Sequence, residues 1–283
     1  MDFLADLIQY QFLRNALVAA VLSGVTCGMV GAYVVFRRAV FLSGGITHAS
    51  FGGIGLAYFA GWNPLVGATL VALLSAVGIE WAADRVKIRE DSAIGIIWSV
   101  GMALGIIFIA LSPGYAPNLV AILFGNILTV TTPDLISSSA LAVVVLAMFA
   151  LWMRPLIYVA FDREFARTQG VPVKLISYTM AVVTALTIVF SIRAVGIVLL
   201  ISLLTFPAVI VNSLTKSFRR IIVWSAVVAT AANIAGLIVS HTMDIPTGAA
   251  TIFVLTVSLI IVKSIPLLFR KITGPDAYNQ NSR

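Results

Sequence analysis

One histidine lies where the sequence would otherwise place only apolar and small side chains. His48 is one of two histidines in the 283-residue chain, near the middle of residues 41–60. That stretch is long enough to cross a bilayer, and an ionisable side chain inside such a span points to function because its burial in lipid is costly. Imidazole is the most common ligand for borderline transition-metal ions. We therefore predict that His48 binds a metal ion; the alternative is a packing histidine bonded to a neighbouring helix carbonyl.

Small residues surround His48 at helical spacing. On a helix, Gly44, Gly52 and Gly55 share one face with His48. A face of this kind lets a neighbouring helix or an aqueous path come close, and we place the transport site there. The hydroxyl of Thr47, that of Ser50 and water could complete a weak shell that exchanges its ion.

Two further ionisable residues are candidate metal ligands. Glu80 is the one acid expected inside a span, but it comes five residues before Arg85 and one turn from the inner surface, so an ion pair with Arg85 is the alternative. His241 ends a predicted span on the outer side, three residues before Asp244, and the alternative there is an interfacial cap.

The composition places these residues in a membrane protein. The chain is 60% hydrophobic and 10% charged, with a mean hydropathy of +1.07, whereas soluble domains carry about 25% charged residues. The formal charge of +7 does not imply nucleic acid, since membrane proteins concentrate Lys and Arg in inner loops. The single cysteine, Cys27, cannot form an internal disulfide. The acidic first residues do not resemble a cleaved signal peptide.

Hydropathy predicts an all-α polytopic membrane protein with eight to nine transmembrane helices. We expect residues 1–272 to form one transmembrane domain and 273–283 a polar tail. Nine spans are counted, and eight remain possible if 175–214 contains one helix broken near Arg193 and Gly196. Residues 118–130 are too short to span, which predicts an outer re-entrant or surface helix. The expected spans are about 13–35, 41–60, 65–83, 92–111, 134–153, 175–192, 195–214, 221–241 and a last one that ends near Phe269.

The basic residues orient this topology. If nine spans alternate from an outer N-terminus, all of the 18 Lys and Arg residues except Arg14 and Arg193 fall at the inner side. This bias predicts an outer N-terminus and a cytoplasmic C-terminus.

The longest inner connection contains a predicted short helix at 162–170. Asp162 suits the N-cap, Glu164 the first turn and Gly170 the C-cap, with Arg163 and Ala166 between them. Its position makes it a candidate docking surface; the alternative is a solvated loop.

Several motifs in order resemble the permease subunits of ATP-binding-cassette importers for manganese, zinc and iron. They are Val-Val-Phe-Arg-Arg at 34–38, Gly-Gly-Ile-Thr-His-Ala-Ser-Phe-Gly-Gly at 44–53, Leu-Phe-Gly-Asn-Ile-Leu at 123–128, Phe-Asp-Arg-Glu-Phe-Ala-Arg-Thr-Gln-Gly-Val at 161–171, Val-Gly-Ile-Val-Leu-Leu-Ile-Ser-Leu-Leu-Thr-Phe-Pro-Ala at 195–208 and Asp-Ile-Pro-Thr-Gly-Ala at 244–249.

This resemblance implies a permease homodimer in the cytoplasmic membrane of a prokaryote. Two cytoplasmic ATPase subunits would drive it, and an extracytoplasmic metal-binding receptor would deliver the ion. Residues 162–170 would then be the coupling helix that seats in the ATPase. The partners are thus a second copy, the ATPase, the receptor and membrane lipid. Transport would proceed by alternating access.

The chain departs from the family pattern at one position. In the family an aspartate commonly lies four residues before the histidine, and here that position is Gly44. Losing a hard oxygen donor should shift preference from manganese toward ions that favour imidazole. Glu80, Asn233 and His241 are candidates for a replacement donor.

The sequence also constrains the chemistry of this chain. No phosphate-binding Gly-x-x-x-x-Gly-Lys-Ser/Thr motif occurs, so ATP would be used by the partner and this subunit would not be an enzyme. We expect the chain itself to bind no cofactor, only the transported metal. The alternatives are a permease for an iron chelate or a cobalamin-like molecule, and an ion-coupled secondary carrier. A membrane hydrolase would need a nucleophile and base or a His-Glu-x-x-His motif, and neither is present.

Overall fold

The computed structural model describes residues 3–86, 89–112, 125 and 127–278, and these residues form helices, turns and connecting loops with no β-strand. Eight of the described helical segments are long and apolar enough to cross a membrane. The prediction of an all-α polytopic membrane protein is therefore confirmed.

The helices follow the hydropathy of the sequence. In chain order they are α1 (Phe3–Gln9), α2 (Gln11–Phe36), α3 (Val40–Ala60), α4 (Pro64–Trp81) with a π-helical turn (Ala82–Val86), α5 (Glu90–Leu111), a 3₁₀ turn (Ile127–Thr129), α7 (Thr132–Phe161), α8 (Arg163–Thr168), α9 (Val173–Val195), α10 (Ile197–Asn212), α11 (Phe218–Met243) and α12 (Thr247–Tyr278).

The break between α9 and α10 decides the number of long spans. Gly196 separates the two helices with φ +84° and ψ 158°, a conformation open mainly to glycine. The 16 residues of α10 extend about 24 Å at 1.5 Å per residue, less than the roughly 30 Å of a bilayer core. The described chain thus has eight helices of spanning length and one shorter apolar helix, α10.

Helix α7 is longer than the sequence indicated. The predicted span ended at residue 153, before Arg154 and Pro155, but the helix continues to Phe161. Proline removes a backbone donor, and the helix adjusts at Trp152, where φ is −109° and ψ 20°. Leu156 and Val159 are buried beyond the kink, so packing continues the helix that the proline alone would have ended.

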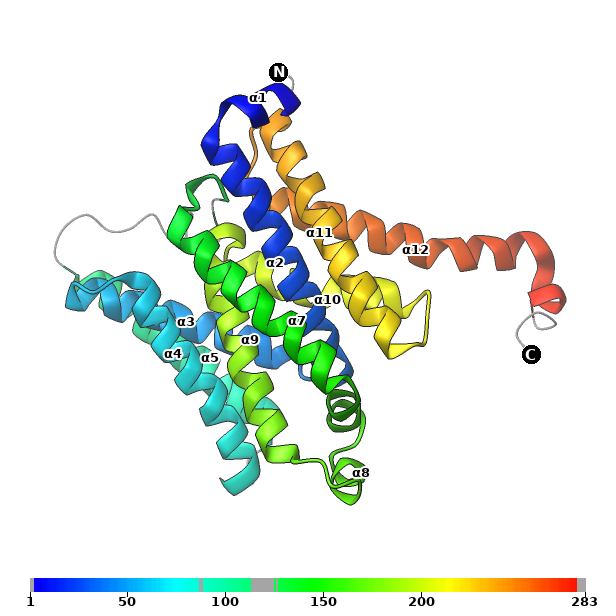
Figure 1. Ribbon diagram of the computed structural model, residues 1–283, viewed down its shortest axis with the longest axis horizontal. Helices are drawn as coiled ribbons and strands as arrows, with labels where there is room; N and C mark the ends of the chain where they lie inside the picture. Colours follow the sequence, from blue (N-terminus) through cyan, green and yellow to red (C-terminus); the bar gives the residue numbers. More distant parts are fainter. Residues whose placement is uncertain (1–2, 87–88, 113–124, 126, 279–283) are drawn as a thin grey trace.

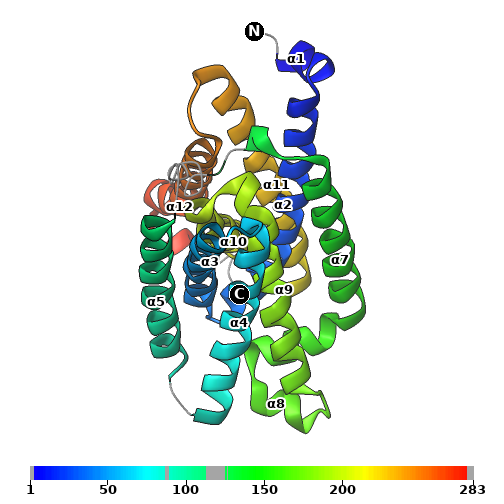
Figure 2. The same ribbon diagram turned by 90° about the vertical axis from the view of Figure 1, so that its left-hand side faces the viewer.

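Two groups of helices form the bundle. On one side α3 packs against α4 and α5, and on the other α2 packs against α7, α10 and α11 (Figure 1). Contacts of α9 with α2, α3, α4 and α7 join the groups. In Figure 2 α3 and α10 are seen nearly end-on, so they are inclined to the upright helices α2, α7, α9 and α11. The transport candidate α3 therefore crosses the middle of the bundle.

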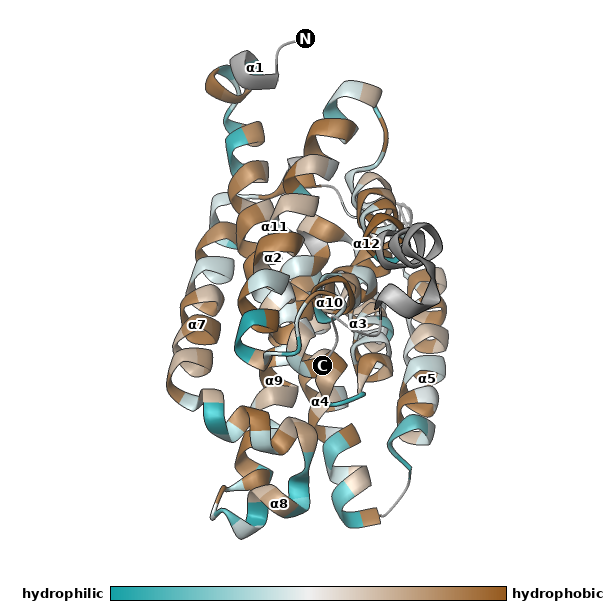
Figure 3. Ribbon diagram, turned by 90° about the vertical axis from the view of Figure 1, so that its right-hand side faces the viewer, coloured by the Kyte–Doolittle hydropathy of each residue, from teal (hydrophilic) through white to brown (hydrophobic). Residues whose placement is uncertain are grey.

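The distribution of apolar and hydrophilic residues along the helices fits a membrane environment. Apolar residues follow the long helices, and hydrophilic residues gather at the end of the bundle that carries α8 (Figure 3).

The predicted outer helix at 118–130 lies mostly outside the described residues; of it, Ile127–Thr129 form a 3₁₀ turn. Helix α12 reaches Tyr278 and extends away from the bundle, so part of the predicted tail at 273–283 is helical (Figure 1).

Candidate functional site

The glycines of α3 bring α5 into backbone contact. A Cβ atom on Gly52 would lie 2.6 Å from the carbonyl oxygen of Gly101, and one on Gly55 would lie 2.5 Å from that of Gly105. Neither position has room for a side chain. The neighbouring helix expected at this glycine face is thus α5. The sequence reading missed Gly101 and Gly105, although their four-residue spacing is the pattern typical of close helix packing in membranes.

His48 faces two side chains of α5. Its ring stacks on the indole of Trp98, with ring centroids 4.3 Å apart and planes inclined by 15°. Its Nδ1 atom lies 3.2 Å from the Sδ atom of Met102. Both His48 and Met102 are partly exposed. The polar contact described for this imidazole is therefore a thioether, not the helix carbonyl considered from the sequence.

The space beside Gly44 is filled by the same tryptophan. A Cβ atom on Gly44 would lie 2.7 Å from Cζ3 of Trp98. Gly44 comes one turn before His48, so the indole covers both positions. An aspartate at position 44 could not fit unless Trp98 moved, which gives a physical reason for the missing carboxylate.

The hydroxyl groups next to His48 are engaged within α3. Thr47 is fully buried and donates to the Ser43 carbonyl at 2.6 Å, and Ser50 donates to the Ile46 carbonyl at 2.7 Å. Within the part of the chain that the structure describes, no group of three or more His, Cys, Asp and Glu side chains is placed to hold a metal ion. Any shell at His48 would therefore need other donors from this chain, water or a second molecule.

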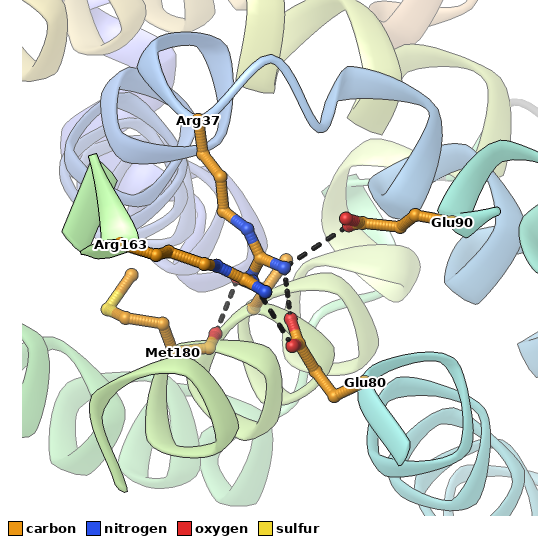
Figure 4. A network of polar contacts seen from close by, with 6 residues as sticks. Arg37, Glu80, Glu90, Arg163 and Met180 are labelled. Carbon is orange, nitrogen blue, oxygen red and sulfur yellow. Dashed lines mark hydrogen bonds and ion pairs between the residues drawn. The ribbon is translucent and has the colours of Figure 1, made fainter. Parts of the chain in front are cut away.

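Glu80 lies in a different cluster. Its carboxylate is only 3% exposed and pairs with Arg37, and its Oε2 lies 3.3 Å from Nη2 of Arg163. Arg37 also lies 3.2 Å from Glu90, so two acids and two arginines share the site (Figure 4). The ion-pair alternative considered for Glu80 is therefore found with different partners: Arg37 and Arg163, not Arg85.

This cluster joins the ends of four helices. Arg37 follows α2, Glu80 belongs to α4, Glu90 begins α5 and Arg163 begins α8. Burial by itself would lower the pKa of Arg37, but the nearby charge of Glu80, with Tyr33 and Glu90, raises that pKa above its ordinary value. The arginine is thus held charged by its neighbours.

The other two candidate donors have partners elsewhere. Nε2 of His241 lies 3.0 Å from the carboxylate of Asp6 and connects α11 to α1. Asn233 donates to the Ala20 carbonyl at 3.0 Å and to the Ser23 hydroxyl at 3.1 Å, and so connects α11 to α2. These contacts account for both side chains without His48.

The short helix predicted at 162–170 is confirmed as α8. The Asp162 carboxylate accepts from the backbone N–H groups of Glu164 and Phe165 at 2.9 and 3.0 Å, as an N-cap should. Ala166 is fully buried, and Gly170 ends the turn with φ +72°. Glu164 pairs with Arg167 on the surface. Phe165 remains 48% exposed, an apolar side chain on an otherwise polar turn.

Comparison with known proteins places this arrangement in a family. The sequence profile of the ABC 3 transport family matches residues 9–265. The chain belongs to this family. As a member of a family of ABC transporter permeases, it is a transport subunit and not the ATPase, as the sequence predicted.

Individual members of the family agree with this assignment. The chain is 32% identical over 252 residues to the manganese transport system membrane protein MntC of Halalkalibacterium halodurans, covering 89% of this chain and 86% of that protein. It is 31% identical over 252 residues to a probable iron transport system membrane protein of Haemophilus influenzae, covering 89% and 92%. The solved structure of PsaBC from Streptococcus pneumoniae in complex with Fab matches with a TM-score of 0.82 at 28% identity, over 92% of this chain and 94% of that one.

Proposed function

We propose that this chain is the permease subunit of an ATP-driven importer of divalent transition-metal ions. The observation that carries the proposal is His48, a partly exposed imidazole in an apolar helix of spanning length. Relatives named for manganese and iron transport support the substrate class. The ion, which is zinc, manganese or iron, is cargo and not a resident cofactor.

The proposal includes a second copy of the chain. Two candidate donors lie together at this site, the His48 imidazole and the Met102 thioether, which are too few for a closed metal shell. Both side chains are partly exposed, which leaves room for an aqueous path or a second subunit. A homodimer with the path near its axis would alternate between outward and inward openings. The bias of Lys and Arg toward one side supports an orientation with the N-terminus outside and with α8 and the C-terminus in the cytoplasm. This orientation requires nine crossings, so α10 would cross together with the eight long helices.

Helix α8 is the proposed contact with the cytoplasmic ATPase. Its exposed Phe165 offers an apolar anchor, and its capped first turn holds a fixed shape. The Arg163–Glu80–Arg37 pairs connect that helix to α4 and to the end of α2. A shift of α8 on ATP binding would therefore move the bundle through these ion pairs. An extracytoplasmic receptor would supply the ion on the opposite side.

Uptake by the reconstituted complex tests the proposal. Liposomes would hold this permease with its ATPase and receptor, and uptake of zinc, manganese and iron would be measured with and without ATP. We expect ATP-dependent uptake that is lost in His48→Ala and retained in the matched control His241→Ala, whose imidazole pairs with Asp6.

Other results would indicate the other functions. Uptake of a ferric chelate or a cobalamin without free metal would indicate a chelate permease. Uptake that follows a proton or sodium gradient without ATP would indicate a secondary carrier. Normal metal uptake in His48→Ala would remove this histidine from the path.

A further inference from the structure

We infer that Met102 is a metal ligand beside His48 and that its thioether sets the selectivity of transport toward zinc over manganese. The inference rests on the proposed function, because it concerns which ion the same site accepts. It starts from the 3.2 Å separation between His48 Nδ1 and Met102 Sδ.

The distance suits two donors that share one ion. Zinc binds imidazole nitrogen at about 2.0–2.1 Å and thiolate sulfur at about 2.3 Å, and a neutral thioether binds more weakly and somewhat farther away. Two atoms 3.2 Å apart can both meet bond lengths of this order at an N–Zn–S angle of roughly 90–95°. An ion could thus enter between the two side chains with little movement of either.

The surroundings hold both donors in place. Trp98 stacks on one face of the imidazole and restricts its rotation. Gly101 and Gly105, on either side of Met102 in sequence, bring the backbone of α5 against α3. The separation of the two helices at this point is consequently fixed by backbone contact. Only the flexible end of the methionine needs to adjust to the ion.

The donor types determine which ions fit. Imidazole and thioether are nitrogen and soft sulfur donors, whereas manganese, magnesium and calcium favour carboxylate and carbonyl oxygen. The position one turn before His48 is Gly44 and offers no carboxylate, and Trp98 fills the space beside it. Among the residues that the structure describes, the one acid buried in a neighbouring span is Glu80, and it is paired with arginines. The described site therefore favours zinc over manganese, although some relatives are named for manganese.

The competing explanation is a packing contact. Nδ1–H could donate to the sulfur with no ion ever bound there. Met102→Leu distinguishes the two, since leucine conserves the volume and apolar character but removes the donor. Met148→Leu is the matched control, because Met148 is a buried methionine on α7.

The first experiment measures selectivity. Zinc and manganese would compete for ATP-dependent uptake by the reconstituted complex in the parent and both variants. We expect the zinc-to-manganese ratio to fall severalfold in Met102→Leu, because the soft sulfur donor is lost, and to stay unchanged in Met148→Leu. Met102→Glu, which supplies a carboxylate, should shift the ratio further toward manganese.

The second experiment observes the bond directly. Zinc X-ray absorption on the permease–ATPase complex without receptor should show a sulfur ligand to zinc that disappears in Met102→Leu. An unchanged ratio together with an unchanged spectrum would overturn the inference while the proposed function stands. Absence of ATP-dependent metal uptake in the parent would instead remove the proposed function.

Discussion

Glu80 on α4 and Arg163 on α8 lie 3.3 Å apart, Oε2 to Nη2, and this pair ties the surface helix α8 to the buried end of a membrane helix. Arg37 completes the contact from the end of α2, with only 6% of its side chain exposed. Two otherwise separate regions, the proposed ATPase contact and the α2–α4 ends, therefore share one buried carboxylate.

Removing that carboxylate should destabilise the protein. Glu80→Ala removes one of the two acids paired with the buried charge of Arg37 among the described residues and leaves Glu90, and breaking a buried pair costs about 3–5 kcal/mol. Thermal unfolding of the detergent-purified permease would measure the loss. Asp91→Ala is the control, because its pair with Arg89 is exposed and screened by solvent and should contribute little to stability. Equal stability of the two variants would contradict a structural role for the cluster.

The same pair predicts a defect in coupling. Arg163→Gln removes the charge from the partly exposed partner and leaves the Arg37–Glu80 pair in place. If motion passes through this contact, metal uptake per ATP hydrolysed should fall severalfold while the permease still assembles with its ATPase. Parallel uptake and hydrolysis measurements would show it. A proportional fall in both activities would point to weaker assembly instead.

The contact of α3 with α5 predicts that Gly52 tolerates no side chain. Gly52→Ala would place a methyl group 2.6 Å from the Gly101 carbonyl oxygen, and such overpacking costs about 1–3 kcal/mol. Gly78→Ala is matched, since nothing lies within 4 Å of a Cβ atom there. That control should be neutral or stabilising by up to about 1 kcal/mol. Unfolding midpoints that move together in both variants would be inconsistent with the contact.

Because Trp98 fills the space beside Gly44, the effect of adding a carboxylate at position 44 should depend on whether the tryptophan is present. Gly44→Asp alone should impair folding and uptake, because the new side chain meets the indole ring. In the double variant Gly44→Asp with Trp98→Ala, the space is vacated and a carboxylate joins His48. Expression and uptake should then recover relative to Gly44→Asp, with a larger share of manganese. Equal impairment of the single and double variants would argue against this steric explanation.

The exposed ring on α8 predicts a binding defect without a stability defect. Phe165→Ala should weaken association with the ATPase by at least severalfold and leave the unfolding midpoint of the permease within about 1–2 °C, since the side chain is 48% exposed. Leu214→Ala removes a side chain that is 69% exposed on another connection and serves as control. Titration of the labelled ATPase onto detergent-solubilised permease would measure the association of each variant, and thermal unfolding would measure its midpoint.

Much of the fold could be predicted from local sequence. Hydropathy identified the spanning helices, and the pattern from Asp162 to Gly170 identified α8 because caps and turns depend on adjacent residues. The predicted end of α7 at residue 153 was wrong. Arg154 and Pro155 indicate a helix end locally, but the buried side chains of Leu156 and Val159 extend the helix through tertiary packing. The short length of α10 follows from the position of Gly196, whose backbone conformation separates α9 from α10.

The candidate site was only half predictable. His48 and its glycine face follow from composition and helical spacing alone. Its neighbours Trp98 and Met102 could not be predicted in the same way, because they belong to another helix. Nothing in the sequence around an apolar residue indicates which residue of another helix it contacts. Gly101 and Gly105 were the available signal for the helix pair. For Glu80 the sequence suggested a partner close in the chain, Arg85, whereas its actual partners come from the end of α2 and from α8.

The stack of Trp98 on His48 also gives the protein an optical reporter of its own. The other four tryptophans are more than a third exposed, whereas the indole of Trp98 is partly covered and lies 4.3 Å from the imidazole, centroid to centroid. A metal ion or a proton on that imidazole would change the emission of the indole beside it. Occupancy of the proposed metal site at His48 could therefore be followed by native fluorescence in real time, with Trp98→Phe as the silent reference.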